Sequence, residues 1–529
     1  METTDFYAIA AGGIVVSLIL VRVLSYLSHL TTAVSVFVSK HLTYPYLIRR
    51  HRLLGPWTHF DVLCHLVYVA ANVFCLCYPN LLASDAGRRA GVLSLVNMIF
   101  LFAGVHLSFV ADLLGISLQR YRGSHRAVGW MVAGLAAVHA VAAVNSAAFT
   151  LSDSRNLFAI IGIASLGVLS LLFLPCFRQF AYEIFLRAHQ VAACLCVYAV
   201  WRHLPLGATS CRLYLYIGTG TFLLTCSMQV LTFIYRNSVF TRRGHPRALV
   251  TYVGADSNDK SGAKPIKVSV ALSRPLRVHP GQYISLRMSA VGWWSWTQSH
   301  PFMVTSWSQG EQSTLELFVQ PRRGLTADLL RHAHAGSGVS FSFPAFISGP
   351  HGVTAPVAQY ETVVLMASGF GVAAVIPYLK QLIHGYNARS SRTRRVHLVW
   401  QLRTPDLAVA VQPWLNGLLK DDVLDNGYIL AISIYLESGD MPTDRMPFGK
   451  HERAVICRGL ADIPKIVQTE IDGGYIERLP DVQEERGEVL VMASLSNELR
   501  DRLRDTVRNH LRDRVRMTEL EFQPGYNEN

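Results

Sequence analysis

The chain has 529 residues, of which 51% are hydrophobic and only 16% are charged, and its net charge is +13. This composition is too apolar for an ordinary soluble protein, and the length predicts several domains. The positive charge alone would fit nucleic acid, but no basic stripe alternates with aromatic residues. We therefore exclude nucleic acid as a partner and attribute the charge to basic loops beside a membrane.

Seven apolar runs are long enough to cross the hydrocarbon core of a membrane, which needs about 20 residues. They cover residues 6–27, 60–78, 90–118, 127–148, 157–174, 184–201 and 213–235. The first has no basic leader and is interpreted as a retained anchor, with a cleaved signal as the alternative.

Lys and Arg residues in the loops number 13 on one side and 5 on the other. The positive-inside rule then places the N-terminus outside and the C-terminal half in the cytosol.

Two pairs of histidines lie in these runs at equal spacing. His125 and His139 are 14 residues apart, and so are His189 and His203. On a helix, 14 residues make nearly a whole number of turns and rise about 21 Å, so both members of a pair share one face. Because one span intervenes, the two helices run in the same direction. His125 should therefore face His189 near the cytosol, and His139 should face His203 near the outside.

Two imidazoles across a gap are a typical axial ligand set for a six-coordinate haem iron. The spacing thus predicts two b-type haems, one above the other, and an electron path across the bilayer. His65 and His106 belong to no such pair and are interpreted as packed polar residues. Asp112 is assigned no role.

Short β-prone runs begin after Arg247, with "ALVTYVG", "IKVSVAL" and "YISLRM" separated by turn residues, which is typical of a small antiparallel barrel. From Tyr360 the pattern changes to strand, glycine turn and helix, followed by the buried strands "RRVHLVWQL", "GYILAISIYL" and "GEVLVMAS". This alternation predicts a parallel sheet. The expected domains are N-terminal spans (1–89), a haem-binding membrane domain (90–240), a small β-barrel (245–355) and an α/β domain (360–529).

Five motifs follow one another in the soluble half: HPGQY (279–283), HPFMVTS (300–306), RRGLTADLL (322–330), GPHG (349–352) and ASGFGVAAVIP (367–377). In this order, and with the four membrane histidines, they resemble the ferric reductase and NADPH oxidase superfamily, and most closely its ferric-chelate reductase branch. The resemblance covers the chain from about residue 90. It implies a membrane bundle, an FAD-binding β-barrel and an NADPH-binding α/β domain of the ferredoxin-reductase type.

The resemblance also implies site residues. Phe302, with His300 and Pro301, would lie at the flavin ring, and Ser306 near the diphosphate. The other implied FAD residues are Gln282, Tyr283, Gly324 and Thr326. For NADPH, the backbone at Gly369 and Gly371 opens a helix and can approach a pyrophosphate, with Gly349 and Gly352 as a second close approach. Arg403 and Arg458 are candidates for the 2′-phosphate, because Arg offers a planar fork to phosphate oxygens.

The chain departs from the family's usual pattern at several places, among them a displaced terminal aromatic and "CRGLADI" in place of a Gly-Arg-Pro segment. Met303 stands where Thr or Ser is usual, and Ser368 where glycine is usual. Near the C-terminus the chain reads "MASLSNEL" where Cys-Gly-Pro is usual. No catalytic side chain is expected beyond the residues that hold the cofactors.

These features predict a flavocytochrome b that moves electrons from cytosolic NADPH to a ferric or cupric chelate outside. It would be a metalloreductase of the plasma membrane, with an internal membrane as the alternative. A superoxide-forming oxidase stays open, although the short external loops favour metal reduction. A reductase of a pathway-specific acceptor also stays open, as does a transporter or receptor that senses nucleotide. The sequence does not predict the oligomeric state.

Overall fold

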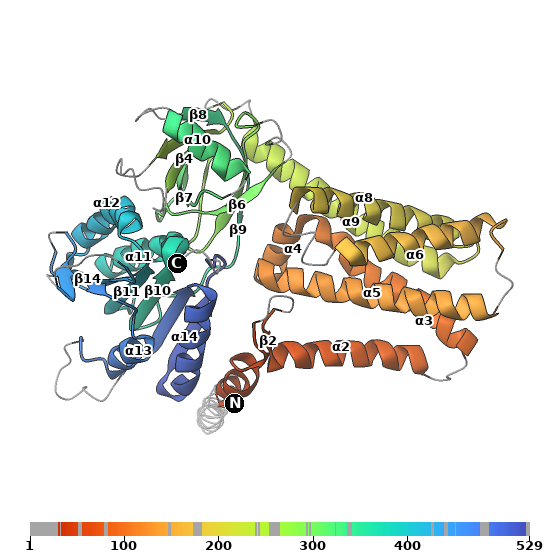
Figure 1. Ribbon diagram of the computed structural model, residues 1–529, viewed down its shortest axis with the longest axis horizontal. Helices are drawn as coiled ribbons and strands as arrows, with labels where there is room; N and C mark the ends of the chain where they lie inside the picture. The colour runs from red at the N-terminus through yellow and green to blue at the C-terminus, as the bar shows by residue number, and fades with distance from the viewer. Residues whose placement is uncertain are drawn as a thin grey trace, which may run out of the picture.

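The computed structural model describes residues 30–524 apart from short gaps. The gaps are residues 32, 51–54, 79–82, 147–149, 173–181, 239–240, 242–243, 253–264, 293–294, 296–297, 323, 336–340, 425–427, 439–442, 450 and 477–485. A bundle of long helices lies beside two soluble units (Figure 1). The first predicted span, residues 6–27, lies outside the described residues.

The membrane half contains seven described α-helices. They are α2 (His59–Cys77), α3 (Ala83–Phe102), α4 (Leu107–Leu114), α5 (Leu118–Ser146), α6 (Ser154–Leu172), α8 (Tyr182–His203) and α9 (Thr209–Asn237). All except α3 and α4 are individually long and apolar enough to cross a membrane. Large apolar side chains such as Phe74, Ile184 and Leu231 are more than half exposed, as expected for a surface that faces lipid. The chain is therefore a multi-pass membrane protein.

The predicted span over residues 90–118 is not one straight helix. It divides into α3 and α4, which meet at 93° across the 3₁₀ turn η2 (Ala103–His106). The chain turns here because His106 leaves the helical region, with φ −120° and ψ 71°. Gly115, at φ +65°, ends α4 as a left-handed cap. The described residues thus hold five spans, or six if the bent pair counts as one, where seven were predicted for the whole chain, the first of them outside these residues.

The two-sheet unit follows α9. Its strands are β3 (Arg247–Tyr252), β4 (Ile266–Leu276), β5 (Tyr283–Arg287), β6 (His300–Met303), β7 (Gln312–Val319), β8 (Phe341–Pro344) and β9 (Phe346–His351), and its helix is α10 (Leu325–Ala335). The strands form two antiparallel sheets, of order β7-β4-β3-β8 and β6-β5-β9. The first three β-prone runs of the sequence are β3, β4 and β5, so the prediction of these strands is confirmed.

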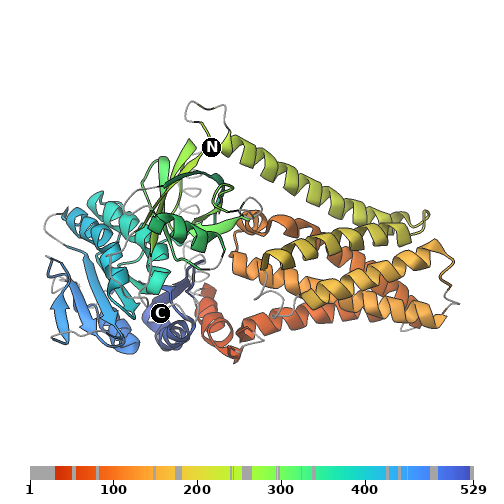
Figure 2. The same cartoon turned by 45° about the horizontal axis from the view of Figure 1, so that its top comes forward.

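A closed barrel is not shown for this unit. The two sheets are separate, and a single bridge between Val304 and Leu317 connects their edges in the described residues. Asn237, the last residue of α9, fastens the unit to the bundle. Its side-chain amide donates to the Ile347 carbonyl at 2.8 Å and accepts from the Ile347 N–H at 2.8 Å. Figure 2 shows α9 as the long helix that extends from the bundle to this unit.

The seven-stranded unit completes the chain. Its strands are β10 (Thr362–Ser368), β11 (Arg395–Leu402), β12 (Leu430–Leu436), β13 (Arg445–Pro447), β14 (Ala454–Arg458), β15 (Val489–Ser494) and β16 (Val515–Glu519), in the order β13-β14-β12-β11-β10-β15-β16. Its helices are α11 (Val372–Asn387), α12 (Asp406–Asp421), α13 (Ile463–Asp472) and α14 (Asn497–Asn509). All neighbouring strands except β13 and β14 pair in parallel, which confirms the predicted parallel sheet.

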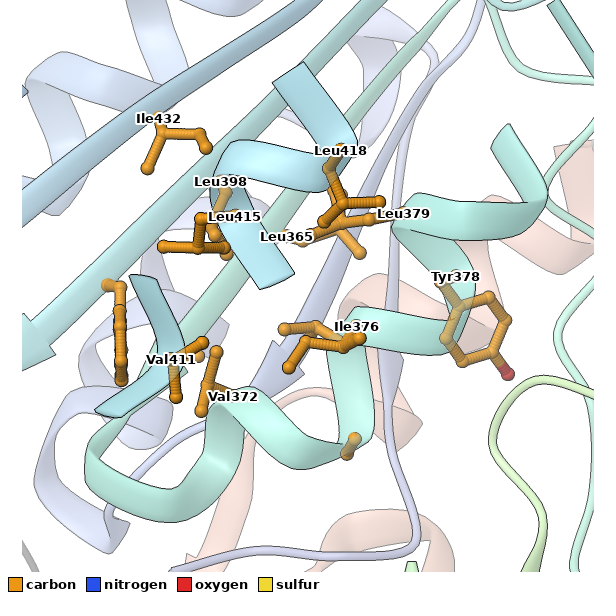
Figure 3. Close-up of a cluster of buried hydrophobic side chains, with 14 of the residues drawn as sticks. Leu365, Val372, Ile376, Tyr378, Leu379, Leu398, Val411, Leu415, Leu418 and Ile432 are labelled. Carbon is orange, nitrogen blue, oxygen red and sulfur yellow. The ribbon is translucent and has the colours of Figure 1, made fainter. Parts of the chain in front are cut away.

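The core of this unit lies between the sheet and helices α11 and α12. Leu365 and Leu398 from the strands meet Ile376 from α11 and Leu415 from α12 (Figure 3). All four side chains are fully buried. Burial on both faces explains why these strands read as continuous apolar runs in the sequence.

The described residues that precede α2 form a strap against α14. It contains the π-helical turn η1 (Ser39–Thr43) and the short strands β1 (Tyr46–Ile48) and β2 (Trp57–Thr58). Arg508 donates to the Lys40 carbonyl at 2.9 Å, and Asp501 accepts from Arg50 at 2.8 Å. Figure 1 shows α14 beside this part of the chain. The strap thus provides a second connection between the membrane half and the soluble half.

A buried ion pair joins α13 to the sheet. Glu470, only 3% exposed, lies 2.9 Å from Arg395 and 2.7 Å from His397 Nδ1. Burial raises the pKa of Glu470, but the hydrogen bonds from His397 and Arg395 outweigh it, and the pKa lies below its usual value. A carboxyl group with a depressed folded-state pKa stabilises the fold above its unfolded pKa. This stabilisation is lost as the pH falls through the folded-state value.

We expect Glu470→Gln to destabilise the seven-stranded unit by about 3 kcal/mol, because it leaves buried Arg395 without its counter-charge. The measurement is the urea concentration at which α13 amides lose hydrogen-exchange protection. Asp472→Asn is the control, because Asp472 and its partner Arg486 are about half exposed and 3.8 Å apart; that change should cost less than about 1 kcal/mol. Equal losses of stability in the two variants at pH 7 would contradict the role assigned to the ion pair of Glu470 and Arg395.

Candidate functional site

The four predicted histidines lie in two facing pairs between α5 and α8. The ring centroids of His125 and His189 are 6.4 Å apart, and those of His139 and His203 are 6.2 Å apart. A metal between two imidazole nitrogens needs about 2 Å on each side, and each nitrogen lies about 1 Å from its ring centre. The expected centroid separation is therefore about 6 Å. Both pairs fit this requirement, so each could hold one metal ion.

The pair His139 and His203 is also oriented in the way that metal ligands require. His139 Nδ1 lies 2.9 Å from the Gly87 carbonyl oxygen, and His203 Nδ1 lies 3.1 Å from the Arg155 carbonyl oxygen. A carbonyl can only accept, so each imidazole carries its proton on Nδ1 and leaves Nε2 as a lone pair. Most metal-binding histidines are fixed by such a contact to their second nitrogen.

Two glycines of the bundle make room for these rings. A Cβ atom at Gly104, in η2, would lie 2.5 Å from the His125 ring, and one at Gly91, in α3, would lie 2.9 Å from the His139 ring. Neither distance is compatible with a side chain unless the imidazole moves. The sequence analysis did not select these glycines. Their separation of 13 residues, close to the 14 of the histidines, is a signal that could have identified them.

The predicted residues at the flavin ring lie on β6. Phe302 packs against the core of the two-sheet unit, Pro301 is exposed, and Met303 is buried in the core of the seven-stranded unit. His300 Nε2 lies 3.3 Å from the Gln298 side chain. Burial lowers the pKa of His300 more than nearby Glu183 raises it, which keeps the imidazole neutral at pH 7.

The other candidate flavin residues are placed by short local contacts. Gln282 accepts from the His279 N–H at 2.8 Å, and the Ser306 hydroxyl accepts from the Glu316 N–H at 3.1 Å. Tyr283, on β5, directs its hydroxyl to Ser108 of α4. Gly324 has φ +69° and immediately precedes α10. Thr326 lies in the first turn of α10 and accepts from the Arg322 N–H at 2.7 Å.

The first two NADPH candidates lie at the switch point of the parallel sheet. Strand β10 has β11 on one side and β15 on the other, and nucleotides bind where the strand order reverses in this way. Gly369 and Gly371 follow β10 there. A Cβ atom at Gly371 would lie 2.1 Å from the Ser494 carbonyl oxygen at the end of β15, so only glycine permits this close approach.

The remaining NADPH candidates lie in two places. Arg403 directly follows β11, Arg458 ends β14, and both side chains are exposed at the carboxyl edge of the sheet. Gly349 and Gly352 lie instead beside β5. A Cβ atom at Gly352 would be 3.3 Å from the Tyr283 ring. The structure therefore brings the two arginines to the same sheet edge as Gly369 and Gly371. It brings the GPHG motif to β5 of the two-sheet unit instead.

Comparison with known proteins yields three family models that match successive parts of the chain. The ferric reductase like transmembrane component matches residues 90–200, the FAD-binding domain matches residues 262–355, and the ferric reductase NAD binding domain matches residues 360–442. These matches follow the order of the membrane half, the two-sheet unit and the seven-stranded unit. The soluble half is thus a ferredoxin-reductase-like pair of FAD and NAD domains.

Curated relatives come from fungi and from a plant. Ferric/cupric reductase transmembrane component 2 of Saccharomyces cerevisiae is 27% identical over 339 residues, which cover 62% of this chain and 44% of the relative. Ferric reductase transmembrane component 3 of the same yeast is 26% identical over 454 residues, covering 77% and 60%. "Probable cell surface ferric reductase kap2" of Aspergillus oryzae is 25% identical, covering 60% and 43%. The chain spans about half the length of these relatives.

Proposed function

We propose that the chain, whose successive parts match a ferric reductase like transmembrane component, an FAD-binding domain and a ferric reductase NAD binding domain, moves electrons from NADPH across a membrane to a ferric or cupric chelate. The observation that carries the proposal is the two facing histidine pairs, with centroid separations of 6.4 and 6.2 Å. The names of the relatives, which include ferric and cupric reductases, support the same class of acceptor. The enzyme would be an NADPH-dependent metalloreductase.

Each part of the chain has a proposed role. His125 and His189 would bind an inner b-type haem, and His139 and His203 an outer one; the haems would supply two one-electron sites between the membrane surfaces. The two-sheet unit (245–355) would bind FAD, which converts a two-electron donor into single electrons. The seven-stranded unit (360–529) would bind NADPH at the Gly369–Gly371 turn. The residues that precede the haem-binding domain (90–240) would provide additional spans.

The basic loops support an orientation in which both nucleotide-binding units lie in the cytosol. The relative named as a cell surface reductase supports the plasma membrane over an internal membrane. Oxygen or a pathway-specific molecule as the acceptor would make the chain an oxidase or a biosynthetic reductase. The short external loops favour a metal chelate, because they offer no enclosure for a small gas.

The acceptor is tested with intact cells and an impermeant ferric chelate. Cells that express the chain should reduce the chelate faster than cells that express His203→Ala, while superoxide formation stays equal. Chelate reduction at the same rate in both strains, with superoxide formed only by the unaltered chain, would contradict metal reduction and favour the oxidase.

We expect the double variant Arg403→Ala and Arg458→Ala to raise KM for NADPH at least about tenfold, because each charge-assisted hydrogen bond to the 2′-phosphate contributes about 1.5–3 kcal/mol. KM for NADH, which lacks this phosphate, should stay within about twofold. Arg394→Ala is the control, since Arg394 is exposed at the opposite edge of the sheet, before β11. An equal increase in KM for both nucleotides would mean that neither arginine recognises the 2′-phosphate.

A further inference from the structure

One short stretch of chain contacts both the inner histidine pair and the two-sheet unit. It begins at Gly104, whose Cα hydrogen faces the His125 ring, and continues through the bend into α4. After the 93° bend, α4 lies at the end of the bundle that faces β9 (Figure 1). Ser108 and Asp112 are four residues apart on α4 and therefore share one face.

These two polar side chains contact two residues that lie opposite each other on neighbouring strands. Asp112 accepts from His351 Nδ1 at 2.7 Å and from the Gly352 N–H at 2.8 Å. The Ser108 hydroxyl accepts from Tyr283 at 2.9 Å. Tyr283 and His351 are directly opposite each other on β5 and β9. Two residues one turn apart on α4 thus contact two residues that are paired across neighbouring strands.

The junction is buried and its donors are fixed. Tyr283 is 4% exposed and His351 is 7% exposed. Burial raises the pKa of Tyr283 to about 12 despite its bond to Ser108, so the hydroxyl stays protonated. His351 Nδ1 donates to the carboxylate, and its Nε2 lies 3.2 Å from the Ser348 hydroxyl. Charge-assisted bonds of this kind are roughly twice as strong as neutral ones.

We propose that α4 is a docking bracket that sets the position of the flavin-binding sheets relative to the inner histidine pair, with Asp112 and His351 as positioning residues for electron delivery to that pair. The proposal rests on the proposed function. It follows because η2 contacts the His125 ring through Gly104, and α4, which continues from η2, contacts Tyr283 and His351 through Ser108 and Asp112. A shift of the sheets relative to α4 changes the gap that the electron must cross, and the transfer rate falls as that gap widens.

The test is Asp112→Asn in the full-length protein loaded with both cofactors. Asn keeps the size of the side chain, but in one orientation it presents an NH₂ group to His351 and in the other to Gly352, so two donors face each other. The matched control is Asp501→Asn. Asp501 also accepts from two donors, Arg50 and Tyr46, but it joins the strap to α14.

Anaerobic stopped-flow absorbance separates the two electron steps. In Asp112→Asn, flavin bleaching by NADPH should stay within twofold, and haem reduction should slow by clearly more than twofold, with flavin and haem contents equal to the unaltered protein. Asp501→Asn should leave haem reduction within twofold. Haem reduction at the normal rate in Asp112→Asn, or equal slowing of flavin bleaching and haem reduction, would overturn the proposal.

Hydrogen exchange provides a readout that needs no activity. In Asp112→Ala the Gly352 amide loses its acceptor, so exchange over residues 349–354 should accelerate, while exchange in α14 should not change. Unchanged exchange at residues 349–354 would mean that the bracket does not hold the sheets. If the unaltered protein contains neither flavin nor haem, the proposed function fails, whereas the exchange result still tests the contact itself.

Discussion

Replacing His203 with alanine will lower reduction of an external ferric chelate more than about 100-fold, since loss of even an outer-shell partner of a metal ligand costs about 10- to 100-fold in metal affinity. His203 belongs to the outer pair, 6.2 Å from His139. In the proposed path, electrons reach the flavin and the inner haem before they reach the outer haem. We therefore expect NADPH to reduce both at the normal rate in this variant, and the haem content to fall by about half.

His125→Ala should act one step earlier. It removes a ligand of the inner pair, so flavin should still be bleached by NADPH while no haem is reduced. His65→Ala is the control, because His65 stacks on Trp57 and is half-buried on α2; its haem content should not change. The measurement is haem per protein, with the NADPH-reduced absorbance of each variant. A His203→Ala protein that reduces external chelate normally would show that the order of the two levels is wrong.

Adding one methyl group at Gly104 will disturb the inner pair alone. The Cβ atom of Gly104→Ala would lie 2.5 Å from the His125 ring, so the imidazole must move from the position in which it faces His189. We expect about half of the haem to be lost and the flavin content to stay normal. Gly91→Ala, with its Cβ atom 2.9 Å from the His139 ring, should instead disturb the outer pair.

Gly220→Ala is the matched control for both glycines. Gly220 is exposed on α9, and no described heavy atom lies within 4 Å of its added Cβ. This variant should retain its full haem content and its low-spin spectrum. Normal haem content in Gly104→Ala and Gly91→Ala would mean that the rings can be displaced without loss of the metal, and that the glycines serve only helix packing.

Local periodicity was sufficient for part of the fold and of the candidate site. The 14-residue spacing fixes which face of each helix carries a histidine, so it predicts the facing of His125 with His189 without any tertiary information. The buried strands β10, β11, β12 and β15 were equally readable, since a parallel sheet covered on both faces requires continuous apolar runs.

Features that depend on distant contacts were not predictable. The bend at His106 was missed because apolar residues continue on both sides of it, and hydropathy does not distinguish a bent span from a straight one. Asp112 received no role, because its partner His351 lies 239 residues further along the chain. The barrel was expected from strand spacing alone, whereas sheet closure depends on tilt and register between strands that are far apart in sequence.

The central claim is that one chain holds a flavin and two bis-histidine haems in series. The most direct test is an anaerobic difference spectrum of the purified protein, NADPH-reduced minus oxidised, with total haem and flavin quantified separately. The predicted result is a low-spin b-type haem signal, two haems and one flavin per chain, and bleaching of the flavin on addition of NADPH. A colourless protein, or haem that NADPH does not reduce although flavin is bound, would contradict the account.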